Sequence, residues 1–453
     1  MSITREIAKF IHDFQYEQIP KSVIPAIKNA FIDTIGVGIA GSEEKGSQII
    51  KNFICAEDAK PTSTIWNSEK KTSPSYAALV NGAMAHALDY DDVNGATQGH
   101  PSTVLVPAIM AAAEEKNSNG KSIILSYFVG FETMAYIGKM LTMQHYLKGW
   151  HATSTFGVLG AAASVGKLYG LSIEQLQTAL GIAVSHSSGT KQNFGTMTKP
   201  YHPGNAARSG IVSATLAQMD FTANNEIMDA PLGFLKLYGD RSLPAIKEKI
   251  GEKFELVENG ISTKKYPCCF ATHRPADAAF ELTRKNNIIV DYIDEIYVRA
   301  PQGAYSPVIH SRPSTGLEGK FSVEYVLATV LLDQKVNLQT FTDEGVQRED
   351  VQNLLKKVVK IEDESIPVKD NAIDEGFVEV TIKVKDQTFV QKVYHPKGSP
   401  QIPLTQEEFH EKFLDCVLNK LDAVSSNRII EIMSTLEEER DLNNLFKMIS
   451  QNN

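Results

Sequence analysis

The chain has few of the residues that mark disulfide-rich or membrane proteins. Its 453 residues include only four cysteines. These four, Cys55, Cys268, Cys269 and Cys416, show no disulfide-framework spacing, which favours a reducing compartment. The longest apolar runs are broken by Gly, Ser or charged residues before they reach about 20 residues, the length of a membrane span. The sequence therefore predicts no membrane partner.

A surplus of positive charge is also missing. Lysine and arginine together number 45 against 54 acidic residues, and the net charge is −9. This balance argues against a nucleic-acid partner. The segment Met1–Phe10 mixes Arg5 and Glu6 with few apolar residues, unlike a signal or transit peptide. We therefore expect a cytoplasmic protein, in which an anionic ligand would need a local cluster of cations.

Helical periodicity dominates the first 262 residues. Small residues are frequent in these helices and permit close packing. Gly36–Gly41 superficially resembles a nucleotide fingerprint, but it ends a helix instead of following a strand, so it predicts close helix contact. Ser172–Gln175 predicts a capping box. The helices expected are Ser22–Ile35, Tyr76–Ala87, Ser102–Ala113, Lys121–Met143, Thr153–Tyr169 and Gly204–Met219.

The pattern changes near Thr263. Period-two alternation predicts three strand segments, the last of them a hairpin that turns at Asp386-Gln387. After Pro403 the helical pattern returns. The sequence thus predicts a mainly α fold: a large all-helical domain, residues 1–262 plus 394–453, with an inserted smaller α/β domain, residues 263–393. The strand segments are Asp294–Ala300, Val358–Glu362 and Phe377–Val393, with helices at Ala276–Lys285 and Phe321–Gln334.

One stretch between two apolar helices, residues 86–101, concentrates titratable side chains. Acidic and basic groups at the ends of buried helices tend to have the shifted pKa values that acid–base catalysis uses. We interpret Asp89 and His100 as a functional pair. The alternative is structural, with carboxylates that cap a helix end and a core histidine at position 86. The stretch contains His86, Asp89, Asp91, Asp92 and His100, with Gly95 and Gly99 allowing a tight bend.

Cations and metal ligands occur elsewhere. Lys199 lies in a polar loop before a helix, where backbone donors favour a carboxylate or phosphate, although most lysines are simply solvated. Lys264 starts a segment where the two predicted domains meet, a preferred place for a ligand cleft. A zinc site from Cys268, Cys269 and His273 has weak support because adjacent cysteines chelate poorly. Asp89, Asp91 and His100 match no defined metal spacing, and we expect no metal.

Several motifs together resemble the MmgE/PrpD family. They are Asn81-Gly82, His86-Ala-Leu-Asp-Tyr-Asp-Asp92, His100-Pro-Ser, Gly157–Gly170, Thr198-Lys-Pro-x-His-x-Gly-Asn-Ala-Ala207 and Lys264-x-Tyr-Pro-Cys. The family includes 2-methylcitrate dehydratase, cis-aconitate decarboxylase and iminodisuccinate epimerase. The resemblance, which covers nearly the whole chain, implies a large helical domain with a smaller α/β lid, a homodimer, and no organic cofactor.

The resemblance also implies site residues. Similarity to the decarboxylase gives roles to Asp89, His100, His151, Lys199, Lys264 and Tyr305. We expect His100 to act as general base or acid, tuned by Asp89, and the two lysines and His151 to clamp substrate carboxylates. Tyr305 would donate a proton or orient a carboxylate; its structural alternative is packing.

Three features depart from the decarboxylase pattern. Val93 stands where that pattern has a threonine, and Cys269 stands where it has a histidine that would touch the substrate. The loop before His100 is also one residue longer. The sequence therefore predicts a cofactor-independent lyase, a dehydratase or decarboxylase acting on a small di- or tricarboxylate. The alternatives are an epimerase of an iminodisuccinate-like dicarboxylate and a non-catalytic carboxylate-binding protein.

Overall fold

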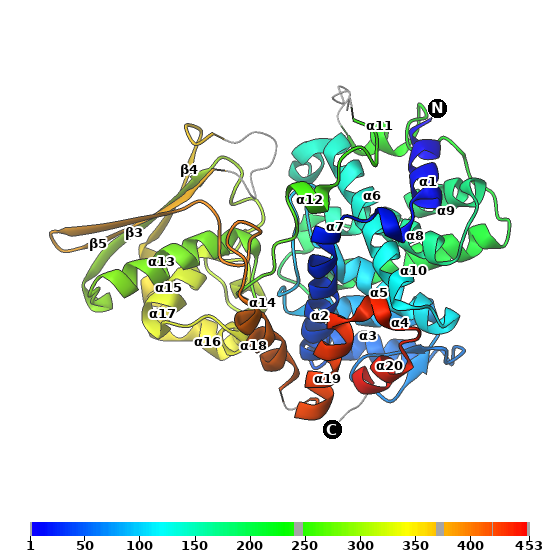
Figure 1. Cartoon of the computed structure of the whole chain (residues 1–453). Coiled ribbons are helices and arrows are strands. Elements are labelled where there is room, and N and C mark those ends of the chain that lie inside the picture. Colours follow the sequence, from blue (N-terminus) through cyan, green and yellow to red (C-terminus); the bar gives the residue numbers. More distant parts are fainter. Residues whose placement is uncertain (1, 240–247, 368–375, 419, 451–453) are drawn as a thin grey trace.

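The computed structural model describes residues 2–239, 248–367, 376–418 and 420–450. The chain forms two lobes, one of helices and one around a small sheet, and the C-terminal helices return to the first lobe (Figure 1). The helical lobe contains α1 (Ile3–Asp13), α2 (Ile24–Gly41), α3 (Lys45–Cys55), α4 (Pro74–Ala87), α5 (Ser102–Lys116), α6 (Gly120–Leu147), α7 (Ala152–Thr155), α8 (Gly157–Leu168), α9 (Ile173–Ser185), α10 (Thr198–Gln218), α11 (Phe234–Tyr238), α12 (Glu255–Glu258), α18 (Gln406–Val417), α19 (Ala423–Ser434) and α20 (Asn443–Ile449), with the short strand pair β1 (Ser63–Thr64) and β2 (Lys71–Thr72).

The second lobe, called the lid below, is built on a four-stranded sheet. The strand order is β4-β3-β5-β6, with β3 and β4 parallel and the other pairs antiparallel. Inward-facing residues of these strands share a core with α13 and α15, separate from the main core of the helical lobe. The lid contains α13 (His273–Lys285), β3 (Ile293–Pro301), α14 (Gly316–Gly319), α15 (Val323–Asp333), α16 (Asp343–Gln347), α17 (Glu349–Leu354), β4 (Val358–Asp363), β5 (Val378–Val384) and β6 (Gln387–Val393).

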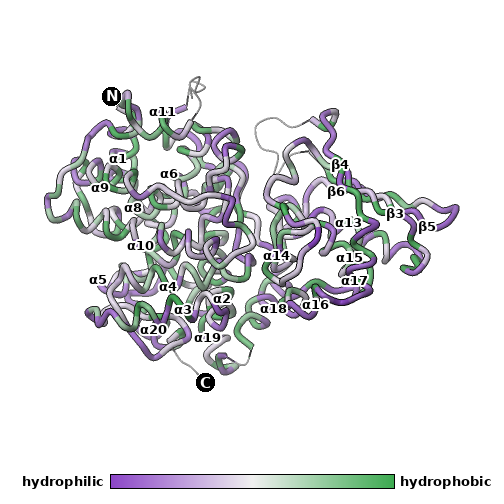
Figure 2. Tube along the Cα trace, turned by 180° about the vertical axis from the view of Figure 1, so that it is seen from behind, coloured by the Kyte–Doolittle hydropathy of each residue, from purple (hydrophilic) through white to green (hydrophobic). Residues whose placement is uncertain are grey.

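Glycines allow the central helices to pack closely, as the sequence predicted. A Cβ at Gly82 of α4 would lie 2.8 Å from the Cα of Gly204 in α10. A Cβ at Gly38 of α2 would lie 2.6 Å from the Trp66 ring. The Gly36–Gly41 segment is therefore a helix-packing element, and the nucleotide-binding alternative is excluded. Figure 2 shows hydrophobic stretches along these helices and hydrophilic ones in outer loops.

The predicted mainly α fold with a smaller α/β lid is confirmed, and the predicted strands and capping box are present. Three predicted helix limits are wrong. The helix expected over Ser22–Ile35 continues to Gly41. The helix expected from Gly204 already begins at Thr198. Pro200 lies in its first turn, where a missing backbone donor costs little, and Pro203 is accommodated inside the helix. The helix expected over 153–169 is divided into α7 and α8 at Phe156.

One segment, Lys21–Gly41, is long and apolar enough to cross a membrane on length and composition alone. The sequence analysis expected no such segment. In the structure, 72% of its apolar window is buried, and α2 packs inside the helical lobe against α4 and α18. A core helix accounts for this segment without a membrane.

Candidate active site

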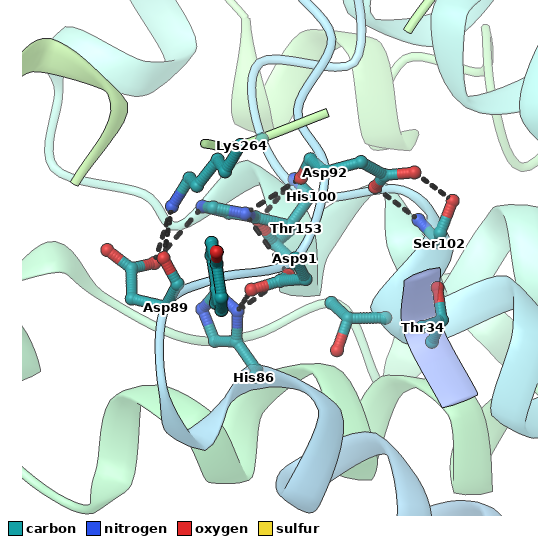
Figure 3. A network of polar contacts seen from close by, with 12 residues as sticks. Thr34, His86, Asp89, Asp91, Asp92, His100, Ser102, Thr153 and Lys264 are labelled. Carbon is teal, nitrogen blue, oxygen red and sulfur yellow. Dashed lines mark hydrogen bonds and ion pairs between the residues drawn. The ribbon is translucent and has the colours of Figure 1, made fainter. Parts of the chain in front are cut away.

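The titratable stretch forms a buried loop between α4 and α5. Asp89 has a positive φ of 52°, and its N–H donates to the carbonyl of His86 (3.1 Å), which turns the chain sharply after α4. Gly99 is required near the other end, because a Cβ there would lie 2.3 Å from Oγ1 of Thr153. As a result, side chains from both ends of the loop converge on one place (Figure 3).

His86 lies at the bottom of the site. Its Nδ1 contacts both carboxylate oxygens of Asp91 (2.9 and 2.8 Å), and the Lys199 ammonium donates to its Nε2 (2.6 Å). Both ring nitrogens are thus used by a neutral imidazole that donates from Nδ1. Burial lowers the pKa of His86 to about 3, with Asp91 opposing the shift. His86 therefore connects Asp91 to Lys199, a role that the sequence did not indicate.

Asp89 is the centre of charge in the site. Its Oδ1 accepts a hydrogen bond from Lys199 (2.8 Å) and forms an ion pair with Lys264 (3.1 Å). Burial alone would raise the pKa of the Asp89 carboxyl, but the two ammonium groups outweigh it and hold the pKa well below the usual value. Among the described residues, Oδ2 has no hydrogen-bond partner. Asp89 is thus an ionised carboxylate with one oxygen still available.

His100 is oriented with one nitrogen toward Asp89. Its Nδ1 lies 3.0 Å from the carbonyl oxygen of Asp92 and 3.2 Å from Oδ2 of Asp91. Because a carbonyl oxygen only accepts, Nδ1 carries the proton, and the lone pair is on Nε2, 3.7 Å from Oδ1 of Asp89. Burial lowers the pKa of His100, while Asp91 raises it. The predicted Asp89–His100 pair is therefore in place, with the basic nitrogen beside the carboxylate.

His151 is held by a second histidine. Its Nδ1 lies 2.9 Å from Nδ1 of His202, one residue donating and the other accepting. Burial lowers the pKa of both imidazoles, well below the usual value for His151 and to about 4 for His202, and Lys199 adds to both shifts. His151, which the sequence predicted to contact a substrate, therefore has a neutral ring. Its position is fixed by His202, three residues after Lys199.

These groups face a cleft of about 720 Å³, including its open mouth, between the helical lobe and the lid. Lys199 is 3% exposed and lies near two phenylalanine rings, with its Nζ 5.2 Å from the centre of Phe194 and 5.0 Å from that of Phe321. In such a dry setting an ammonium interacts strongly with an anion. The lining residues used below are Asp89, Val93, His100, His151, Lys199, Cys269, Arg274 and Tyr305.

Two predicted site residues have placements that differ from their expected roles. Lys264 is fully buried, does not line the cleft, and donates to the carbonyl of Asp89 (2.7 Å) as well as pairing with its carboxylate. It holds both the main chain and the carboxylate of Asp89 and is not itself exposed to a ligand. Tyr305 lines the cleft, but its hydroxyl donates to the carbonyl of Val298 (2.7 Å), and burial raises its pKa. The hydroxyl is therefore already used in a hydrogen bond inside the lid.

Two of the three departures from the decarboxylase pattern, Val93 and Cys269, line the cleft. Val93 borders it from the loop between α4 and α5, and Cys269 borders it from the lid. Burial raises the pKa of the Cys269 thiol to about 11, so it is a neutral group there. Arg274, the second residue of α13, also lines the cleft and was missed by the sequence analysis. Its place in the helix that follows the Lys264 motif was the available signal.

A metal ion fits this site poorly. His86, Asp89, Asp91 and His100 each offer one ligand atom, all within 4.8 Å of one another. However, the ammonium of Lys199 already lies within 2.8 Å of two of these residues, and a divalent cation would be repelled by it. The described residues show no comparable group at the Cys268–His273 segment. The lysines supply the positive charge that a metal would otherwise bring.

Asp92 faces away from the cleft and should make stability depend on pH. Its carboxyl accepts the N–H of Ser102 (3.2 Å) and contacts the Ser102 hydroxyl, and burial raises its pKa from 3.8 to about 8. The folded state therefore holds a proton that the unfolded chain releases near pH 4, so this group's contribution to stability falls as the pH rises from about 4 to about 8.

Asp92→Asn keeps the neutral shape and should raise the melting temperature at pH 8 by several degrees relative to wild type, and much less at pH 5. Calorimetry at both pH values checks this. A melting-temperature difference that does not vary with pH would contradict it.

Comparisons with known proteins agree along almost the entire chain. Residues 5–246 match the model of the MmgE/PrpD N-terminal domain, and residues 266–438 match that of the MmgE/PrpD C-terminal domain. The chain is 31% identical to "Cis-aconitate decarboxylase" of Homo sapiens, covering 97% of this chain and 93% of that protein. It is 26% identical to the enzyme of that name from Aspergillus terreus (99% and 96% covered) and 22% identical to "Probable 2-methylcitrate dehydratase" of Saccharomyces cerevisiae (93% and 87% covered).

Proposed function

Because the chain belongs to the MmgE/PrpD family, we propose that it is a lyase that removes water or carbon dioxide from a small di- or tricarboxylate without an organic cofactor. The observation that carries this proposal is the lone pair of His100 Nε2, held beside Asp89 and Lys199 at the floor of a buried cleft. A base next to a desolvated cation is the arrangement needed when negative charge develops beside a carboxylate.

The same chemistry serves both reactions. In dehydration, His100 takes a proton from the carbon next to a substrate carboxylate, and the C–H electron pair forms the new double bond. The hydroxide leaves and takes the proton back from the His100 imidazolium as water. In decarboxylation, the electron pair of the broken C–C bond forms a new double bond, and the electron pair of the substrate's existing double bond moves to the carbon beside a remaining carboxylate. Protonated His100 then gives its proton to that carbon. In each case Lys199 stabilises the carboxylate that receives the charge.

A polyanionic substrate would change the charge state of the site. Asp89 and Asp91 balance Lys199 and Lys264, while His100 and His86 are neutral. Added carboxylates beside His100 raise its pKa, because nearby negative charge favours the imidazolium. Substrate binding therefore prepares His100 to return a proton to carbon.

We place a cis-aconitate-like tricarboxylate first among substrates. The relatives named cis-aconitate decarboxylase are 26–31% identical to the chain, whereas those named 2-methylcitrate dehydratase, one of them as probable, are 22% identical. Val93 and Cys269, which border the cleft, would adjust which substituent is accepted. We also propose that the protein acts in the cytoplasm as a homodimer, on the family resemblance and the cysteine usage.

A substrate panel in D2O tests the function. Cis-aconitate, 2-methylcitrate, citrate and iminodisuccinate are incubated with the protein and followed by proton NMR. We expect loss of carbon dioxide or water from one tricarboxylate. Decarboxylation should place deuterium on the product carbon next to a carboxylate, whereas dehydration should introduce it only by exchange into the remaining substrate. Inversion of iminodisuccinate without elimination would identify an epimerase instead. Binding of these anions without exchange or turnover of any would contradict the enzymatic proposal.

A further inference from the structure

Three consecutive carbonyl groups of the loop between α4 and α5, called the catalytic loop below, each accept a hydrogen bond from a buried lysine. Lys320 donates to Leu88 (2.8 Å), Lys264 to Asp89 (2.7 Å) and Lys412 to Tyr90 (2.9 Å). The three lysines come from the end of α14 in the lid, from the segment that joins the lobes, and from α18. The main chain that carries Asp89 is thus fixed by three distant parts of the sequence.

Lys320 differs from the other two lysines. Lys264 pairs with the Asp89 carboxylate (3.1 Å) and Lys412 with that of Asp33 (2.6 Å). Within the described ranges, no carboxylate lies at ion-pair distance from Lys320, whose two acceptors are the carbonyls of Leu88 and Pro267 (3.1 Å). Its ammonium is buried and lies 4.9 Å from the centre of the Phe341 ring. Burying a cation without a counter-ion is costly, so its bonds to the main chain need a reason.

The position of Lys320 supplies that reason. Its own carbonyl accepts the N–H of Cys269 (2.9 Å), and the next residue, Phe321, lies beside the Lys199 ammonium. One residue therefore connects the cleft wall at Cys269, the ring next to Lys199, and the loop beneath Asp89. Moving it would displace all three relative to His100.

We propose that Lys320 is a positioning residue that ties the lid to the Leu88 carbonyl and so keeps Asp89 in its left-handed conformation beside His100 and Lys199. It touches no cleft surface and acts through the loop. The readouts by turnover rest on the proposed function, whereas the exchange measurement below does not.

The hydrogen bond from Lys320 to the Leu88 carbonyl should depend on pH. Burial lowers its pKa to about 8; Glu44, Asp89 and Cys268 act in the opposite direction, and Lys264 adds to the lowering. The ammonium therefore loses its proton as the pH rises through about 8, and the amine left behind makes weaker hydrogen bonds. We expect the catalytic loop to loosen in the same range.

Variants of Lys320 test the proposal by kinetics. Lys320→Met should lower kcat by about tenfold or more, as expected for a lost charge-assisted hydrogen bond, with KM changed much less. Lys320→Arg should keep most of the activity and move the alkaline limb of the kcat profile upward. Lys335→Met, an exposed lysine in the same lobe, should behave as wild type. Asp92 also titrates near pH 8, so Asp92→Asn is a further control: the alkaline limb of the kcat profile should persist in that variant if it arises from Lys320. Equal losses in the Met and Arg variants with an unshifted limb would overturn the proposal.

Hydrogen–deuterium exchange provides a second test that needs no turnover. In the Asp92→Asn protein, which lacks the other group of this loop that titrates near pH 8, exchange in residues 86–101, corrected for the intrinsic rate, should rise above pH 8 relative to α8. A constant ratio across pH 7–9 would overturn the proposal. If no polycarboxylate is turned over but exchange in residues 86–101 rises relative to α8, the proposed function fails and the positioning role of Lys320 is still supported.

Discussion

Replacing His100 by asparagine should lower kcat by about 10²–10⁴-fold, the usual contribution of a positioned general acid or base. The asparagine amide can still donate to the Asp92 carbonyl that now accepts from Nδ1, so the loop should remain in place. What disappears is the Nε2 lone pair beside Asp89. Steady-state kinetics on the substrate found in the panel, together with deuterium exchange at its carbon, measure the loss.

Binding separates a lost base from a damaged site. Lys199 and His151 remain in the variant, so the affinity for the substrate, measured by calorimetry, should change little. His186→Asn, a half-buried histidine that does not line the cleft, is the matched control and should keep wild-type rates. Deuterium exchange at the wild-type rate in His100→Asn would show that another group moves the proton.

Replacing Lys199 by methionine should lower kcat/KM by about 10²–10³-fold, equivalent to the roughly 2–4 kcal/mol that a desolvated charge contact contributes to a transition state. Two effects act together. The cleft loses its buried ammonium, and Asp89 and His86 each lose a hydrogen-bond donor. With one ammonium gone, the pKa of Asp89 should rise and the acidic limb of the pH–rate profile should move upward, since Lys199 is the largest influence that lowers this pKa.

The control for this variant is Lys265→Met. Lys265 is half-buried, lies next to Lys264 in the sequence, and does not line the cleft. Its replacement should leave kcat/KM within a few-fold of wild type. A Lys199→Met enzyme with a normal kcat/KM and an unshifted acidic limb would contradict the assignment of Lys199 to the substrate carboxylate.

The sequence predicted that Asp89 and His100 lie close together because they belong to one short loop. Asp89 and His100 lie 11 positions apart between two apolar helices, and a short loop between buried helix ends has little freedom to separate them. Lys199 was also recognisable, since a lysine at a helix start within a polar motif is unusual for a solvated surface residue.

Other parts of the site were missed or given another role for one physical reason. His86 hydrogen-bonds Asp91 and Lys199. Lys264 donates to the carbonyl of Asp89, and the Tyr305 hydroxyl donates to the carbonyl of Val298. Each of these facts depends on which neighbour fills the space around a side chain after packing. Residue type and spacing carry no information about such neighbours when they come from different elements.

The amino-acid sequence by itself determined the mainly α fold with a smaller α/β lid, because period and turn chemistry act over short distances. It also determined the motifs through which the family was recognised. Only the tertiary structure decided which groups hold Asp89. Lys199 and Lys264 both contact Oδ1 of Asp89. Lys320 and Lys412 donate to the carbonyls of the neighbouring residues Leu88 and Tyr90. Burying that many charges is affordable only where their partners meet them at hydrogen-bond distance, and that meeting is a property of the packed chain.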